Sequence, residues 1–281
     1  MGKHYFATAV LLRESLFLNG ILTNAEIWYG MSKSDIKELE NLDHTLLRKI
    51  LKTPYSTPVE SMYLELGLLN IETILMARRI NYLQYLTKRK KSEMLSKFFI
   101  AQWNHPAPTG DWTEEVKNNL LAFGMEIDLE KIEAMSKFTF KSLVKRKAKE
   151  FALINFMEQM FTHSKMTNLW YTDLKMQDYL KCDEMNPAQA MSVYSYRTRM
   201  AVYSDNYKGQ GGVGTCPLCH LHLDVQSLSF QCIEVRKNVK ICGKYEDIFG
   251  DRISSELAKT VYDMSILRKK FLEERTVENL P

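Results

Sequence analysis

Three of the chain's five cysteines lie with two histidines in a short segment whose residue types and spacing can bind a metal ion. The segment reads Cys216-Pro-Leu-Cys219-His220-Leu-His222, and Cys232 follows it. Two thiols in C-x-x-C spacing can hold one tetrahedral metal ion from a single tight turn, and a histidine and a later cysteine can complete the ligand set. We therefore predict a structural zinc knuckle formed by Cys216, Cys219 and Cys232 with His222, or with His220 in its place.

Two other interpretations of the same thiols stay open. Cys216 and Cys219 can be buried or reduced thiols beside incidental histidines, or they can form a redox C-x-x-C pair. A redox pair of this kind follows a strand and precedes a helix in a βαβ unit. Here the four glycines of residues 209–214 come before the pair and a histidine-rich turn comes after it. This context favours a metal ligand set over redox chemistry.

The composition is that of a globular chain in a reducing compartment. The chain has 281 residues, of which 45% are hydrophobic and 26% charged, so one large or two modest domains can form around a sizeable core. An odd number of widely spaced cysteines does not resemble a secreted disulfide framework. Residues 5–31 are apolar but are interrupted by Arg13, Glu14 and Glu26, which leaves no run long enough to span a bilayer. We expect a nuclear or cytoplasmic protein without a membrane partner.

The distribution of basic residues matters more than their total. A net charge of +4, from 38 basic and 34 acidic residues, does not by itself indicate a nucleic-acid partner. One dense basic run ends a helix predicted from Ile71 to Leu86, and a second cluster lies in a helix predicted over 137–161. Each cluster can be a solvated helix face, or it can neutralise phosphates. The residues concerned are Lys88, Arg89, Lys90 and Lys91 in the first cluster, and Lys141, Lys145, Arg146, Lys147 and Lys149 in the second.

We interpret the basic residues of the second cluster as having no acidic partner at i+4. Like charges on one face are unfavourable in an isolated helix, and a polyanion would relieve their repulsion. A third candidate contact lies in the helix that begins at Asn186-Pro187. There Tyr194 and Tyr196 are followed closely by Arg197 and Arg199. Aromatic and arginine side chains together can stack on bases and bind phosphates, although the same spacing also fits a core face with flanking cations.

Apolar residues recur at helical spacing through most of the chain, which predicts a mainly α, bundle-like array of helices. The knuckle is expected between the last helices, with at most a short strand or hairpin, for which residues 235–242 are the candidate. Turn-forming residues at 104–110 mark a break. We expect a helical region over 1–104, a second helical region with the basic helix over 111–208, and the knuckle with a C-terminal helix over 209–281.

Several catalytic motifs are absent from the sequence. It has no glycine-rich phosphate-binding loop, no H-E-x-x-H and no G-x-S-x-G motif. It also lacks an aromatic-x-Asp-Asp pair, so the paired carboxylates that hold two metal ions in a polymerase are not present. We predict that this chain is not an enzyme and needs no small-molecule substrate.

Ordered landmarks across residues 11–250 resemble the region that follows the polymerase palm in LINE-like, non-LTR retrotransposon reverse transcriptases. The first two landmarks are Leu16-Phe-Leu-Asn-Gly20-Ile-Leu-Thr-Asn24-Ala-Glu-Ile-Trp28-Tyr-Gly30 and Leu46-Leu-Arg-Lys-Ile-Leu51. Further landmarks are Thr57-Pro-Val-Glu60, Leu64-Glu-Leu-Gly67, Arg78-Arg79 with Tyr82-Leu83, and finally Cys216-Pro-Leu-Cys219, Asp224-Val-Gln226-Ser-Leu228 and Cys232. The resemblance implies a thumb-like region over 1–104 followed by a C-terminal zinc knuckle.

The chain departs from this family at two points. The palm and its catalytic aspartates are absent, and Leu228 stands where the family's Asp-x-Gln-x-His pattern places a histidine ligand. A knuckle here therefore depends on His220 or His222, with Cys242 as a further possible donor. The resemblance implies a non-catalytic protein that grips template RNA or target DNA beside a separate palm. The alternative is a vestigial or domesticated helical module that binds a protein partner and no nucleic acid.

Overall fold

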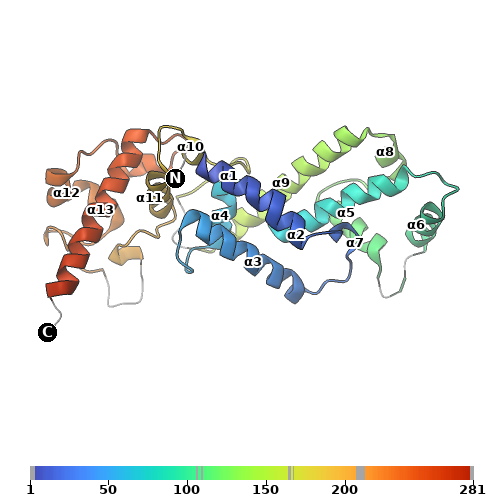
Figure 1. The fold of residues 1–281 in the computed structure, drawn as a ribbon, viewed down its shortest axis with the longest axis horizontal. Coiled ribbons are helices and arrows are strands. Elements are labelled where there is room, and N and C mark those ends of the chain that lie inside the picture. The colour runs from blue at the N-terminus through green and yellow to red at the C-terminus, as the bar shows by residue number, and fades with distance from the viewer. Residues whose placement is uncertain are drawn as a thin grey trace.

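The computed structural model describes residues 4–105, 107–108, 110–163, 166, 168–206 and 213–278. Almost all of the regular structure in these ranges is helical, and the helices follow one another along an elongated molecule (Figure 1). The predicted mainly α fold is confirmed. In the described residues the only β pairing is two isolated bridges, Leu66 with Met176 and Thr215 with Leu223.

The N-terminal half of the chain alternates long helices with short turns. Its first helical run continues through a π-helical segment (Arg13–Leu18) that separates α1 from α2. The helices are α1 (Tyr5–Leu12), α2 (Asn19–Ile21), a 3₁₀ turn (Ala25–Ile27), α3 (Lys33–Leu51), α4 (Val59–Leu66), α5 (Ile71–Thr87), α6 (Met94–Asn104), α7 (Trp112–Ala122) and α8 (Leu129–Ala134).

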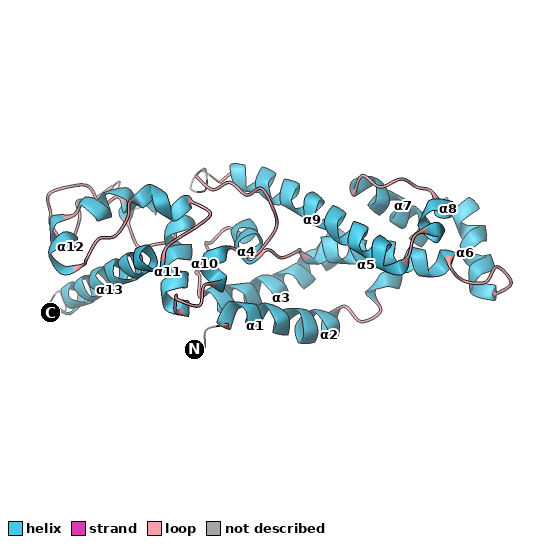
Figure 2. Ribbon diagram, turned by 90° about the horizontal axis from the view of Figure 1, so that it is seen from above, coloured by secondary structure: helices cyan, strands magenta, loops and turns pink. Residues whose placement is uncertain are grey.

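The C-terminal half begins with the longest helix and then becomes more irregular. Its elements are α9 (Lys137–Phe161), α10 (Asp178–Lys181), α11 (Pro187–Arg197), a 3₁₀ turn (Ser204–Asn206), a second 3₁₀ turn (Gln226–Gln231), α12 (Ile233–Asn238), a third 3₁₀ turn (Tyr245–Phe249) and α13 (Ser255–Glu278). Helix α11 packs against α13 at one end of the molecule, while α5 packs along α9 towards the other (Figures 1 and 2).

The strand predicted over residues 235–242 is wrong. Cys232 has extended backbone and precedes α12, in which Val235 is buried, and the buried Val239 follows the helix. The two buried valines are four positions apart, which is the spacing of one face of a helix. The alternation of residues over 235–242 suggested a strand, but burial of these two side chains against neighbouring elements favours the helix in this context.

The hydrophobic clusters cross the predicted region boundaries. One cluster joins side chains from all three predicted regions, including Leu47, Met157 and Cys232. A second cluster contains both Phe99 and Trp112, which lie on opposite sides of the break at 104–110. The boundary at 208–209 falls outside the described residues, as do Gly209, Gly211 and Gly212.

Gly67 ends α4 at a point where two backbone segments touch. Its φ is +66°, and a Cβ built there would lie 2.2 Å from Lys175 C and Met176 N. The contact is held by the Gln177 amide, which donates to Glu65 O at 2.9 Å. Because backbone atoms cannot move aside as a side chain can, only glycine fits at this position.

We therefore expect Gly67→Ala to lower the free energy of unfolding by more than about 2 kcal/mol, since the left-handed backbone alone costs about 1–2 kcal/mol and the overlap adds to it. Gly20→Ala is the matched control, because Gly20 is helical with no atom near its Cβ position. It should stabilise the protein by about 0.5–1 kcal/mol. Urea denaturation measures both changes. Equal midpoints for the two variants would contradict the close approach.

Candidate metal centre and cationic cleft

The cysteine-rich segment folds back on itself in a short antiparallel turn. Thr215 pairs with Leu223, and the Cys216 amide donates to His222 O at 2.7 Å. The His220 amide donates to Cys216 O at 2.9 Å, and His220 has a left-handed backbone with φ of +55°. This closed turn holds Cys216, Cys219 and His222 on one loop. Cys232, the residue that precedes α12, approaches them from outside the loop.

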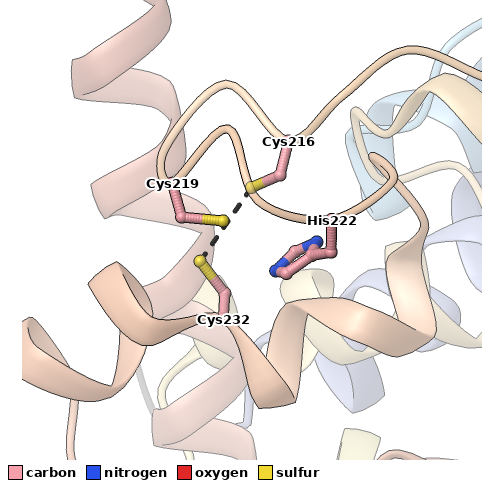
Figure 3. A group of neighbouring side chains, drawn as sticks. All are labelled: Cys216, Cys219, His222 and Cys232. Atoms are coloured by element: carbon pink, nitrogen blue, oxygen red, sulfur yellow. Dashed lines mark hydrogen bonds between the residues drawn. The ribbon is translucent and has the colours of Figure 1, made fainter.

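Four side chains meet at this turn in a geometry that fits a tetrahedral metal ion. One ligand atom from each of Cys216, Cys219, His222 and Cys232 lies within 4.8 Å of all the others (Figure 3). The Sγ atoms of Cys216 and Cys232 are 3.9 Å apart. Zinc–sulfur bonds of about 2.3 Å in a tetrahedron place two sulfurs about 3.8 Å apart. The residues can therefore hold a metal ion, and three thiols with one imidazole are a donor set that zinc accepts.

His222, rather than His220, completes this group. The Nδ1 atom of His222 lies 2.9 Å from Leu223 O. With the proton on Nδ1 donated to that carbonyl, Nε2 presents its lone pair, and Nε2 is buried without a hydrogen-bond partner. A metal-binding histidine is commonly oriented in this way, by a backbone carbonyl on its other nitrogen. His220 is exposed, and neither His220 nor Cys242 belongs to the group.

The thiols of the group differ in their acidity. Burial raises the pKa of Cys232 to about 11. Burial also acts to raise the pKa of Cys219, but hydrogen bonds from the Leu221 amide and from the neighbouring thiols lower it overall. A bound cation would favour the thiolate form of every cysteine. Within residues 213–232, no strand–turn–helix surrounds the C-x-x-C pair, so the setting that a redox pair requires is not found.

The two polar residues of the family-like pattern fasten the knuckle to the helices. Asp224 Oδ2 accepts a hydrogen bond from Arg268 Nη2 of α13 at 2.7 Å. Gln226 Nε2 donates to Tyr196 O of α11 at 2.8 Å, and its Oε1 accepts from Asn206 Nδ2 at 2.9 Å. Since these groups are buried, the bonds fix the turn against both helices.

The predicted nucleic-acid contacts at the end of α11 and just after it need correction. Arg197 is only 3% exposed and donates from Nε to Glu65 Oε1 at 2.7 Å. Tyr196 is fully buried, and its hydroxyl shares a hydrogen bond with Tyr203. Arg199 is partly exposed, but it pairs with Asp205 at 2.5 Å. Arg197 therefore cannot reach a nucleic acid, because this face of α11 is core.

The basic cluster of α9 is also less uniform than its sequence suggested. Glu150 lies 3.8 Å from Arg146 and 2.9 Å from Lys147, so these charges are paired. Lys149 donates to Leu174 O at 2.7 Å and is partly buried. The expectation of like charges without an acidic partner at i+4 was wrong for Arg146, which has Glu150 at that spacing. Lys141 and Lys145 are exposed.

Helices α5 and α9, which lie side by side in Figure 1, border a cleft of about 720 Å³ that gathers cations from both. Lys88, Arg89 and Lys141 were predicted as contact residues, and they line this one cleft. Lys90 and Lys91 are exposed beyond the end of α5 and are not among the lining residues. The other lining residues are Asn19, Glu26, Arg78, Asn81, Tyr82, Gln84, Tyr85 and Lys137.

Two of the cleft's cations are oriented by neutral acceptors, so their charge is not neutralised. Arg78 Nη1 donates to Leu22 O at 2.5 Å, and Lys88 Nζ donates to Met135 O at 2.5 Å. Lys137 opens α9, and the first turn of this helix contains no acidic residue. A cation there is repelled by the positive end of the helix dipole. An anion in the cleft would relieve this repulsion.

Four residues of this cleft were not predicted to contact nucleic acid: Arg78, Tyr82, Tyr85 and Lys137. A signal was present, because Arg78, Tyr82 and Tyr85 are spaced three or four residues apart and so share one face of α5, and Arg89 follows just beyond the end of that helix. That face adjoins Lys137 and Lys141 only because α5 and α9 pack together, which sequence spacing does not reveal.

Comparison of the chain with models of known protein families, with curated protein sequences and with solved structures gives no match. The resemblance to retrotransposon reverse transcriptases therefore depends on the sequence landmarks alone. Among the helices that the structure describes, none combines the length and the apolar character needed to cross a bilayer.

Proposed function

We propose that this chain is a non-catalytic nucleic-acid-binding protein that holds phosphates in the α5–α9 cleft and carries a structural zinc ion at Cys216, Cys219, His222 and Cys232. The observation that carries the proposal is the cleft, where five cations and only one acidic residue converge from separate helices. A concave surface of one charge sign concentrates oppositely charged ligands. A nucleic-acid backbone supplies closely spaced negative charges.

The zinc ion has a structural role in this proposal. Four protein ligands close the coordination sphere, and a closed sphere has no position at which a substrate could bind. The knuckle lies between α11 and α13, to which Asp224 and Gln226 fasten it. In keeping with the sequence resemblance, we place the chain beside a separate polymerase palm, where it would grip template RNA or target DNA.

The affinity for nucleic acid should fall steeply with salt if the cleft binds phosphates. Each phosphate contact contributes about 0.7–0.9 to the slope of log K against log salt concentration. The double variant Lys137→Ala, Lys141→Ala should therefore reduce the slope by about 1.5. Fluorescence anisotropy with a labelled oligonucleotide over a salt titration measures this slope.

The matched control for this experiment is Arg146→Ala, Lys147→Ala, which removes two cations of the same helix that pair with Glu150 outside the cleft. It should leave the slope nearly unchanged. An affinity that does not vary with salt, or an equal effect of the two double variants, would contradict phosphate binding in the cleft.

A second candidate function is a protein-interaction module without nucleic-acid affinity. It is favoured by an apolar group on the N-terminal helical run, where Leu11, Leu12 and Leu16 are all at least half exposed. Exposed apolar clusters mark partner surfaces. Replacing Leu12 and Leu16 by glutamine should then abolish self-association or partner binding measured by sedimentation, while the salt titration above would show no oligonucleotide binding.

A further inference from the structure

The cationic cleft contains an aromatic pair that phosphate binding does not require. The rings of Tyr82 and Tyr85 stack with their centroids 5.5 Å apart and their planes at 22°. Tyr82 also meets the ring of Trp112 edge to face at 5.8 Å. Trp112 is itself held by the hydrogen bond from its Nε1 to Glu26 O at 2.8 Å. The inner ring of the pair is therefore fixed from two sides.

The outer ring is available to a ligand. Tyr85 is 48% exposed, and the Arg89 guanidinium lies over its ring, 5.0 Å from the ring centroid. Arg89 is itself oriented by Glu93, whose Oε2 lies 3.1 Å from Nε. The tyrosine ring and the guanidinium over it are two layered flat surfaces, and a base can stack on the outer side of this pair. Both surfaces lie in the same cleft as Arg78, Lys88, Lys137 and Lys141.

This combination of flat surfaces and cations distinguishes between nucleic-acid forms. In a duplex the bases are stacked on one another and only their edges are accessible in the grooves, so a tyrosine ring in a cleft cannot reach a base face. In a single strand the bases can turn outward and stack on aromatic side chains while cations follow the phosphates. Asn81 and Gln84 add polar groups to the same wall, but Gln84 Nε2 already donates to Ile132 O and Met135 O.

We propose that the α5–α9 cleft binds single-stranded nucleic acid, with a base stacked on Tyr85 and Arg89 and the adjoining phosphates held by Lys88, Lys137 and Lys141. This inference rests on the proposed function and specifies its ligand. Because a stacked ring accepts any base, binding has little dependence on sequence.

The test measures binding of two labelled ligands at one salt concentration, for the full chain and three variants. One ligand is single-stranded oligothymidylate, and the other is the duplex that it forms with oligodeoxyadenylate. Tyr85→Ala should weaken single-strand binding about 5- to 150-fold, the range for loss of one base–aromatic stack, whereas Tyr85→Phe should bind like the parent. The control is Tyr55→Ala, because Tyr55 is also an exposed tyrosine beside an arginine, with Arg48 at 4.5 Å from its ring. That tyrosine lies in another cleft and should have no effect.

A second readout does not depend on affinity. Tyr85→Trp places a fluorophore at the proposed stacking surface, and its emission should be quenched when oligothymidylate binds but not when the duplex binds. Equal or tighter duplex binding with no effect of Tyr85→Ala would overturn the single-strand inference while leaving phosphate binding intact. Absence of salt-dependent binding to either form would overturn both the inference and the proposed function.

Discussion

Replacing Cys216 and Cys219 by serine is expected to release one zinc ion per chain and to unfold the turn between residues 213 and 232. The two thiols supply half of a ligand group whose atoms lie within 4.8 Å of one another, and a tetrahedral site with two ligands has little affinity for zinc. Structural zinc contributes about 10–16 kcal/mol to folding in isolated finger peptides. Here Asp224 and Gln226 also hold the segment, so its unfolding should stay local while α3, α5 and α9 remain folded.

The metal content of the purified, reduced protein measures the first effect, and hydrogen exchange of amides at 213–232 measures the second. Cys182→Ser, Cys242→Ser is the matched control, because it removes two thiols outside the ligand group and should keep the zinc. His222→Ala should weaken zinc binding, and His220→Ala should not. A parent protein without zinc, or zinc retained after loss of both Cys216 and Cys219, would refute the site.

The features that the sequence predicted well are those determined by residues close together in the chain. Helical periodicity extends over a few turns, and it correctly predicted a mainly α fold. The C-x-x-C pair and His222 lie within seven residues, so one turn brings them together. Leu228, where the family pattern has a histidine, left the fourth ligand open between His220 and His222. The structure distinguishes them because His222 lies beside the thiols with its ring oriented by a neighbouring carbonyl, whereas His220 is outside the ligand group.

The features that were missed depend on residues far apart in the chain. Lys88 and Lys141 were identified separately, but nothing in their local sequence shows that the packing of α5 on α9 brings them to one cleft. The buried pair of Arg13 and Asp43, joined at 2.5 Å and 2.6 Å, was likewise not predicted, because Arg13 was counted only as an interruption of an apolar run. A π-helical segment containing Arg13 cannot be recognised from periodicity of 3.6 residues.

Arg197 was also mispredicted because its partner is far away in the sequence. It is a core residue that was interpreted as a surface contact. Glu65, its partner, lies 132 residues earlier in the sequence. The position of Glu65 between Leu64 and Leu66, in a helix whose residues from Ser61 to Leu66 are all buried, was the available signal. A carboxylate in such a helix requires a buried cation or several donors, but sequence alone does not say which arginine supplies it.

Arg197→Met is expected to lower the free energy of unfolding by about 3–5 kcal/mol, the range for removal of one partner from a buried ion pair. Glu65 would remain fully buried without its cation, while the Tyr171 hydroxyl donates to Oε1 at 2.6 Å. Arg197 Nη1 also donates to Ile248 O at 2.6 Å, so its loss would free a carbonyl of the turn before α13. Burial acts to lower the pKa of Arg197, but the Glu65 carboxylate raises it overall, and the guanidinium stays charged at any pH used in the experiment.

The double variant Arg197→Met, Glu65→Gln separates the charge from the packing. It removes both charges with little change in volume, so it should recover part of the stability lost in Arg197→Met, because the uncompensated carboxylate is gone. The surface control is Arg146→Met, since Arg146 is exposed and lies 3.8 Å from Glu150; its effect should stay within about 0.5 kcal/mol. Denaturant midpoints compare all three variants. Arg197 joins α4, through Glu65, to α11 and to the turn before α13. If Arg197→Met lowers the free energy of unfolding no more than Arg146→Met does, the packing of these elements does not depend on the buried pair.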